Sequence, residues 1–333
     1  MTSDADAARE MAEAWETLWP LMDLVTPMAL RVADHLPDDD GGGAVRVEDL
    51  AERVGADQDA LGRLLRHLVH RGVFTEPRPG EFAADRTAAM LRSDHPASMR
   101  TWLDLDGFGG RMDLAFTELM HTVRTGEPAW ERVFGRPFWR YLDENPAIGA
   151  SFDATMAANP GDRIAVAEGH DWTAVRHVAD VGGGTGAVIA EVLRRHPHLR
   201  GTLVDLPETA ARGRDHLAGL GLDDRCEVVG QSFFDPLPAG ADVYLLCRVL
   251  HDWDDAHAEA ILRRCAEAAG EGGRVLVVES YGTDGDDRAQ IAEMDLRMLV
   301  LAGGANAAST TTRPSPPAPV CVWPRCAGRR SGT

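Results

Sequence analysis

Apolar side chains in the first hundred residues follow helical spacing and then give way to a hairpin pattern. A helix is predicted from about Ala7 to Leu36, where one face gathers the apolar residues Leu18, Leu21, Leu24, Val25 and Met28. VRVEDLAERVG and DALGRLLRHLVHRG predict two more helices, ended by Gly55 and Gly72. VFTEPRPGEFAA then predicts two short strands around a Pro/Gly turn. Two helices followed by a hairpin form a winged-helix arrangement, which we expect over residues 1–100.

The second of these paired helices is basic, which raises the question of nucleic-acid binding. Its basic side chains are Arg63, Arg66, His67, His70 and Arg71. The whole chain nevertheless carries a net charge of -19, which disfavours a function that rests on broad neutralisation of phosphates. We therefore expect a scaffold or dimerisation domain and no nucleic-acid partner. A winged-helix regulator that binds an adenosyl or aromatic ligand is the alternative.

Helical patterns continue over residues 101–165, where the aromatic residues Trp102, Trp130 and Trp139 occur. FDATMAANP is amphipathic, and Met156 and Asn159 are spaced so that one helix face can hold both. We expect this segment to line a small-molecule pocket with Trp102, Met156 and Asn159. An ordinary core role for Met156 is an equally good interpretation.

From about His177 the pattern changes to short apolar runs separated by helical stretches. The runs are RHVADV, GTLVDLP, RCEVVGQSF, ADVYLLCRVL and GGRVLVVESY. Strands that alternate with helices imply a parallel α/β sheet. Residues 166–304 are therefore predicted to form a Rossmann-like domain.

The first strand runs into a glycine-rich loop, DVGGGTG, from Asp180 to Gly186. Glycine allows a tight turn and a close approach to a ligand, and the helix that follows favours an anionic group at its N-terminus. Asp205 ends the second strand, just before Leu206, and a carboxylate there can accept both hydroxyls of a ribose. The two motifs indicate an adenosine-type cofactor and do not distinguish NAD from S-adenosylmethionine.

The third motif, LHDWDD, follows the fourth strand, so His251 faces the edge of the sheet where the glycines lie. A neutral histidine can take a proton near neutral pH, and a carboxylate such as Asp252 can orient its ring. Glu279 ends the fifth strand and reaches the same edge. A histidine that starts a helix or packs in the core is an equally good reading of His251 alone.

Composition argues against disulfide-rich, zinc-binding, secreted and membrane-spanning classes of protein. The five cysteines are scattered, with no CxxC pair, which argues against a disulfide framework and a structural zinc site. The N-terminus lacks the apolar core of a signal peptide, and no apolar run is long enough to span a membrane. We expect a cytoplasmic protein with no membrane partner and no bound metal.

DVGGGTG, LVDLP, SFFDPLP and VLHDWDD, in this order and spacing, resemble the S-adenosylmethionine-dependent small-molecule O-methyltransferases. That family includes plant caffeate-type enzymes and bacterial enzymes for polyketides and naphthoates. The segment TWLDLDGFGGRMDLAFTELMHTVRTGEP resembles the bacterial branch, and the resemblance covers roughly residues 15–304. It implies a winged-helix domain used for homodimerisation and a Rossmann-like class I methyltransferase domain.

The resemblance also implies roles for individual residues. Asp180, Gly182, Gly184, Asp205 and Leu206 would line the cofactor, with Asp205 on its ribose. Ser232 and Phe233 match the place where the family holds the adenine, and Cys247 falls where some members have a lysine that touches the cofactor. His251 matches the general base, Glu279 matches a carboxylate that hydrogen-bonds it, and Asp252 lies beside both.

The activity implied is S-adenosylmethionine-dependent methylation of an aromatic hydroxyl. A phenol is mostly protonated at pH 7, so His251 would remove its proton as the oxygen attacks the methyl group. Two other classes of protein share parts of this pattern. An NAD-dependent reductase is disfavoured because the chain has no Lys and few Tyr for a hydride site. The remaining alternative is a methyltransferase-fold protein that binds the cofactor but has lost methyl-transfer activity.

The last 29 residues, 305–333, depart from the family pattern. They contain no acidic residue, four Arg and five Pro, so they are predicted to be disordered, leaving the fifth strand as an open edge. The family continues here with R-E-R, a helix and two strands. Reading the codons in the shifted frame allows R-E-R across ANA and Ala from Trp323/Pro324, and the lack of Lys indicates a GC-rich gene. One interpretation of this tail is a natural low-complexity extension, and a frameshift is the sharper hypothesis.

Overall fold

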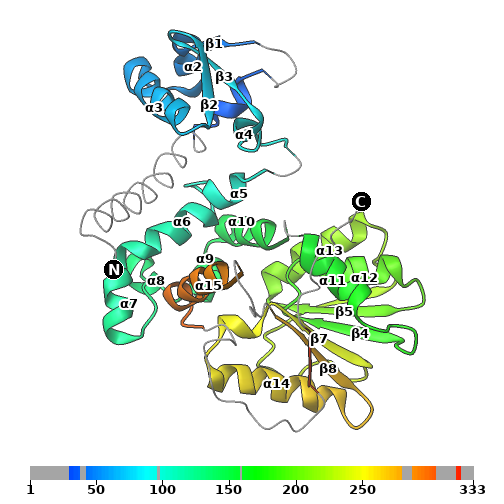
Figure 1. The fold of residues 1–333 in the computed structure, drawn as a ribbon. Coiled ribbons are helices and arrows are strands. Elements are labelled where there is room, and N and C mark those ends of the chain that lie inside the picture. The colour runs from blue at the N-terminus through cyan, green and yellow to red at the C-terminus, as the bar shows by residue number, and fades with distance from the viewer. Residues whose placement is uncertain are drawn as a thin grey trace, which may run out of the picture. The chain divides into compact units, whose positions relative to one another are not determined.

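A computed structural model describes residues 30–37, 43–95, 98–157, 160–279, 287–304 and 320–323 of the 333-residue chain. The chain forms two compact units, residues 1–113 and 114–333. Each unit has its own hydrophobic core. The two units are described separately below, and Figure 1 labels their helices and strands.

The first unit is built from two helices and a small antiparallel sheet. Its elements are β1 (Val45–Arg46), α2 (Val47–Val54), α3 (Gln58–His70), β2 (Phe74–Arg78) and β3 (Glu81–Ala84). The strands lie in the order β1-β3-β2. Gly55 ends α2 in the left-handed conformation, and Asp57 caps α3 by accepting a hydrogen bond from the N–H of Ala60. The predicted helix pair and hairpin are confirmed.

The helix predicted from Ala7 to Leu36 falls mostly outside the described residues. Within the described part, Val32–His35 form a short 3-10 helix, η1, whose Val32 and Ala33 are buried in the core of the first unit. The short helices α4 (Arg86–Ala89) and α5 (Arg100–Leu103) follow the hairpin.

Helices fill the segment between the hairpin and the large sheet, as predicted. They are α6 (Phe108–Ala115), η3 (Phe116–Glu118), α7 (Leu119–Thr125), α8 (Trp130–Phe134), α9 (Phe138–Glu144), α10 (Pro146–Ala157) and α11 (Pro160–Gly169). Aromatic rings join several of them. Trp130 is fully buried and lies edge-on to Phe138 of α9, at 4.9 Å between ring centroids.

A six-stranded sheet forms the second unit, in the order β6-β5-β4-β7-β8-β9. Its strands are β4 (His177–Val181), β5 (Arg200–Asp205), β6 (Cys226–Gly230), β7 (Val243–Cys247), β8 (Arg274–Val278) and β9 (Val320–Trp323). All the pairings are parallel. The five predicted strands and their parallel arrangement are therefore confirmed.

Alternate side chains of each strand enter two separate cores because a strand points successive residues to opposite faces. Val178, Leu203 and Leu245 pack under α12 (Ala187–Arg195) and α13 (Pro207–Gly219). Their neighbours Ala179, Val204 and Leu246 pack under α14 (Asp255–Ala269) on the other face. In Figure 1, α12 and α13 lie on one side of the sheet and α14 on the other. Helix α15 (Asp287–Leu301) follows β8 in the chain.

The prediction of an entirely disordered tail and an open edge at β8 is wrong for Val320–Trp323. These residues form β9, which pairs with β8 in the register Val275↔Val320 to Val278↔Trp323. The run VCVW has the β-branched and aromatic composition that strands favour. In the sequence it is flanked by Pro319 and Pro324, and proline is disfavoured inside a sheet. The other residues predicted to be disordered lie outside the described part of the chain.

No helix in the described ranges is long and apolar enough to cross a membrane.

Candidate active site

The glycine-rich loop leaves the carboxyl end of β4 with its backbone pressed against neighbouring side chains. Gly182 has a φ of 71°, and a Cβ placed on it would lie 3.0 Å from Val249 Cγ2 and 3.4 Å from Phe233 Cε1. A side chain at this position would therefore be both strained and crowded. The contact also brings the loops that follow β4, β6 and β7 together at one edge of the sheet.

Asp205, at the end of β5, faces this loop. Its Oδ2 accepts a hydrogen bond from the N–H of Gly184 at 2.8 Å, and its Oδ1 accepts one from the N–H of Leu206 at 2.7 Å. Each carboxylate oxygen keeps a second acceptor site for a ligand hydroxyl. Burial raises the pKa of Asp205 to about 6, although the two backbone hydrogen bonds favour its charged form.

Asp180 lies beneath the loop. It is fully buried, and a Cβ on Gly183 would lie 2.6 Å from its carboxyl group. Burial, together with the charge of Asp205, raises the pKa of Asp180 to about 7. Asp180 therefore lies against the backbone of the loop at Gly183.

The loop after β6 and the end of β7 place the remaining predicted cofactor residues. Gln231 donates its N–H to the Asp205 carbonyl at 2.9 Å, and Ser232 Oγ accepts from the N–H of Phe234 at 3.2 Å. Phe233 lies against Gly182 as described. Cys247 ends β7, where burial raises the pKa of its thiol well above the usual value.

A single carboxylate holds the turn that carries His251. Glu279 follows β8, and its Oε1 accepts from the N–H groups of Val249 at 3.1 Å and Leu250 at 2.8 Å. Its Oε2 lies 2.7 Å from His251 Nδ1. Because an ionised carboxylate only accepts, Nδ1 carries the proton, and Nε2 of the neutral ring has a free lone pair. The turn itself is η4 (Leu250–Asp252), preceded by Arg248 with the strained φ of 60°.

The charges around His251 favour its protonated form. Burial alone would lower the pKa of His251, but the charge of Asp252 and the hydrogen bond to Glu279 outweigh burial and raise that pKa. Burial likewise acts to raise the pKa of Glu279, but His251 and Arg248 hold it below its usual range. Asp252 Oδ1 lies 3.3 Å from His251 Nε2, and burial raises the pKa of Asp252 to about 6. The ring can thus take up a proton that neighbouring carboxylates stabilise.

The structure describes two of the three residues that are predicted to line the acceptor pocket. Met156 is near the end of α10 and is 47% exposed. Trp102 belongs to the first unit and packs against its core. Asn159 lies outside the described residues.

An ion pair that the sequence motifs did not reveal connects α10 to α13. Arg212 Nε donates to Asp153 Oδ2 at 2.7 Å, and Asp153 is only 7% exposed. The two charges act in opposite directions on the pKa of Asp205, so the pair lies close to that carboxylate. The signal in the sequence was an acidic residue inside the otherwise apolar FDATM, which is unusual unless the charge is paired.

Trp253 was also missed as part of the site, although it lies within the HDWDD motif. Its ring is stacked on Trp139 of α9, with centroids 5.9 Å apart and planes at 12°. It also lies edge-on to Phe233 and Phe234, at 5.7 and 5.0 Å. The aromatic contacts thus connect the helical segment to the loop beside Gly182.

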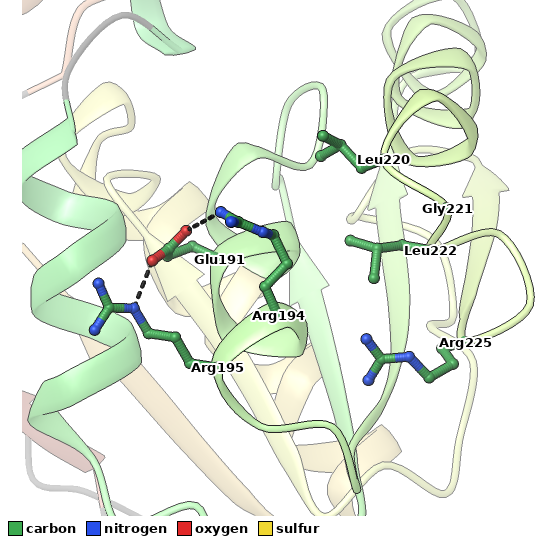
Figure 2. Close-up of a pocket in the computed structure, with 7 residues that line it drawn as sticks. All are labelled: Glu191, Arg194, Arg195, Leu220, Gly221, Leu222 and Arg225. Carbon is green, nitrogen blue, oxygen red and sulfur yellow. Dashed lines mark hydrogen bonds and ion pairs between the residues drawn. The ribbon is translucent and has the colours of Figure 1, made fainter.

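A separate hollow of about 540 Å³ lies at the opposite, amino-terminal edge of the sheet. Figure 2 shows the residues that line it, Glu191, Arg194, Arg195, Leu220, Gly221, Leu222 and Arg225. Arg194 donates to Glu191 at 3.1 Å, and Arg225 donates to the carbonyls of Leu193 at 3.0 Å and Pro197 at 3.1 Å. These guanidinium groups already have protein acceptors, and we assign the hollow no role.

Fold and site together define a class I S-adenosylmethionine-dependent methyltransferase: a parallel sheet, a glycine loop, a carboxylate after β5 and a histidine held by a carboxylate. Among the described residues, no group of His, Cys, Asp and Glu side chains could hold a metal ion. The chain belongs to the O-methyltransferase family. The O-methyltransferase domain matches residues 116–312, and the O-methyltransferase dimerisation domain matches residues 17–94.

Relatives come from bacterial natural-product pathways. The chain is 47% identical to the 2,7-dihydroxy-5-methyl-1-naphthoate 7-O-methyltransferase of Streptomyces carzinostaticus, over 85% of this chain and 86% of the relative. It is 46% identical to the aclacinomycin 10-hydroxylase RdmB of Streptomyces purpurascens, over 85% of this chain and 78% of the relative.

One solved structure that the chain resembles contains both the cofactor and an aromatic acid. It is the O-methyltransferase NcsB1 from neocarzinostatin biosynthesis, in complex with S-adenosylmethionine and 2-hydroxy-5-methyl naphthoic acid. It matches with a TM-score of 0.78 and 44% identity, over 86% of each chain. The protein is thus an S-adenosylmethionine-dependent O-methyltransferase of natural-product biosynthesis.

Proposed function

We propose that this enzyme methylates a phenolic hydroxyl of a naphthoate-like polyketide, with His251 as the general base. The 2.7 Å contact between His251 Nδ1 and Glu279 carries the proposal because it assigns the proton of the neutral ring to Nδ1 and leaves Nε2 as the nitrogen that accepts a proton. The comparisons support the acceptor class, since one relative is named a naphthoate O-methyltransferase and a similar solved structure contains a naphthoic acid.

The cofactor site is proposed at the carboxyl edge of β4, β5 and β7. Gly182 and Gly184 would let the cofactor approach the backbone, Asp205 would accept its ribose hydroxyls, and Leu206 would lie beside them. Ser232 and Phe233 would hold the adenine, and Cys247 would border the site from β7. Asp180 would support the loop from below. The crowding at Gly182 and the two open acceptor sites of Asp205 support this fit.

The proposed mechanism needs little more than alignment and one proton transfer. The bound S-adenosylmethionine supplies an electrophilic methyl group on its sulfonium. His251 Nε2 would take up the phenol proton as the oxygen gains the methyl group and S-adenosylhomocysteine is released, and Glu279 on Nδ1 and Asp252 beside Nε2 would stabilise the resulting imidazolium. The helical segment would hold the acceptor in line for this attack. Trp102, Met156 and Asn159 stay our predicted acceptor contacts.

The organisation of the protein is proposed from the same observations. The boundaries we propose are 1–100 for the dimerisation domain, 101–165 for the pocket segment, 166–304 for the cofactor domain and 305–333 for the aberrant tail. The match to the dimerisation domain supports a homodimer. Cys226, Cys247 and Cys265 are free thiols, which suits a reducing compartment such as the cytoplasm.

Calorimetry and product analysis on the full chain test the function. We expect S-adenosylmethionine and S-adenosylhomocysteine to bind at about micromolar Kd, roughly -8 kcal/mol, and NAD not to bind. With 2-hydroxy-5-methyl naphthoic acid as acceptor, the product should gain one methyl group. A product that gains one oxygen instead would contradict the proposal and place the chain with its hydroxylase relative.

The tail offers a second test, because we propose that a frameshift altered residues 305–333. In the shifted frame an R-E-R motif would follow Gly304 and supply a second carboxylate near His251. The chain as written should then turn over at least ~10-fold more slowly than a chain with the frame restored, since a lost charged hydrogen bond at a base costs about 1.5–3 kcal/mol. A shifted frame that is absent from the gene or interrupted by a stop codon would refute the frameshift. Equal turnover of the two chains would refute the predicted loss of activity.

A further inference from the structure

Gly304, just after the end of α15, lies against the backbone of the turn that carries His251. A Cβ placed on Gly304 would lie 2.3 Å from the carbonyl oxygen of His251 and 2.4 Å from the carbonyl carbon of Asp252. Real Cβ atoms do not come this close to other heavy atoms, so position 304 admits no side chain unless a backbone moves. Gly304 is itself buried.

The same turn is held from its other side by Glu279, through the N–H groups of Val249 and Leu250 and through His251 Nδ1. Glu279 precedes α15 in the chain and Gly304 follows it. The turn is therefore fixed by hydrogen bonds to its amides on one side and by close packing against its carbonyls on the other.

Helix α15 is too closely packed to move away and make room for a side chain at position 304. Val300 and Leu301 in its last turn are 0% and 2% exposed. Arg297 lies over the Phe116 ring at 5.6 Å, and the N–H of Gly303 donates to the carbonyl of Met298 at 3.0 Å. A larger residue at 304 would thus push against the carbonyls of His251 and Asp252 and displace the short turn η4.

We propose that Gly304 is a positioning residue of this enzyme. Its lack of a side chain lets the end of α15 lie against the carbonyls of His251 and Asp252 and keeps the ring of His251 on Glu279. The inference rests on His251 being the general base, as proposed above. It predicts that a single methyl group at position 304, outside the substrate and cofactor contacts, impairs proton removal and leaves cofactor binding intact.

The test is Gly304→Ala in the full chain, with Gly219→Ala as a matched control. Gly219 ends α13, and a Cβ there would meet nothing within 4 Å. We expect Gly304→Ala to lower kcat about 10- to 100-fold, the scale of a misplacement near 1 Å, with the Kd for S-adenosylmethionine changed less than about threefold. The half-maximal pH of the kcat profile should also shift downwards as His251 moves off Glu279, because that hydrogen bond raises its pKa. Gly219→Ala should match the parent in all three measurements.

The outcomes separate this inference from the proposed function. If the parent chain transfers a methyl group and Gly304→Ala keeps its kcat and pH profile, the positioning role is refuted and the function stands. If the parent and the frame-restored chain bind S-adenosylmethionine but transfer no methyl group, the function itself fails.

A second variant covers the case in which Gly304→Ala does not fold. Ala292→Gly, at an exposed position inside α15, weakens this helix without adding atoms, at a cost of about 1 kcal/mol. Hydrogen exchange at the amides of Val249 and Leu250 should then become at least ~3-fold faster, because local opening is easier. Unchanged exchange at these amides would overturn the proposal.

Discussion

Replacing His251 with alanine is expected to lower kcat by about 10²- to 10⁴-fold, the usual contribution of a positioned general base. The affinity for S-adenosylmethionine should stay within about threefold, because His251 belongs to η4 and not to the glycine loop. Stopped or continuous methyl-transfer assays, paired with calorimetry, measure both quantities. A variant that retains more than about a tenth of the parent kcat would show that the acceptor loses its proton elsewhere.

Glu279→Gln separates orientation from basicity in the same site. The glutamine keeps an acceptor for the backbone amides but removes the negative charge that raises the pKa of His251. In the parent, activity should rise with pH as His251 loses its proton, and its half-maximal point should lie above the ordinary histidine value. In Glu279→Gln that point should move to lower pH, and the maximal rate should fall. An unmoved profile would mean that Glu279 does not govern the titration of His251.

Asp205→Asn is expected to weaken S-adenosylmethionine binding by about 10- to 100-fold, the loss of roughly 1.5–3 kcal/mol for hydrogen bonds to a charged acceptor. The amide can offer only one acceptor oxygen, while the native carboxylate must serve Gly184, Leu206 and a ribose together. Asp223→Asn, on an exposed residue before β6, is the matched control and should bind like the parent. Calorimetry at pH 8 measures the difference.

The pH dependence of S-adenosylmethionine binding tests independently whether the charged form of Asp205 favours binding. Since the pKa of Asp205 is about 6, the carboxylate is charged at pH 8 and becomes protonated as the pH falls through 6. Affinity for S-adenosylmethionine should therefore decline below about pH 6 in the parent and stay flat in Asp205→Asn. A parent affinity that is constant from pH 5 to 8 would argue against a ribose contact at Asp205.

Much of the fold could be predicted because local patterns determine it. Each predicted strand was a short apolar run, and parallel strands that alternate with helices must bring their carboxyl ends to one edge. That rule alone places the Gly182 loop, Asp205, His251 and Glu279 together, and the structure has them there. The four-residue strand Val320–Trp323 was hidden because proline and polar residues around it dominated the composition of the tail.

The parts of the site that escaped prediction depend on contacts between segments far apart in sequence. Arg212 pairs with Asp153, which is 59 residues away in the sequence, and no local pattern near either residue predicts this pairing. Trp253 stacks on Trp139 across an even longer interval. Gly304 matters only because α15 returns its end to η4, which no periodicity in the chain reveals.

Because Glu279 and Gly304 both follow His251 in the chain, the order of synthesis limits when the base can be assembled. A ribosome that has delivered β4 to β7 has already exposed the glycine loop and Asp205, yet the η4 turn still lacks both of its supports. Domains generally fold as units during synthesis. Premature termination between β7 and Glu279 would therefore leave the turn that carries His251 without the hydrogen bonds of Glu279 and the packing of Gly304.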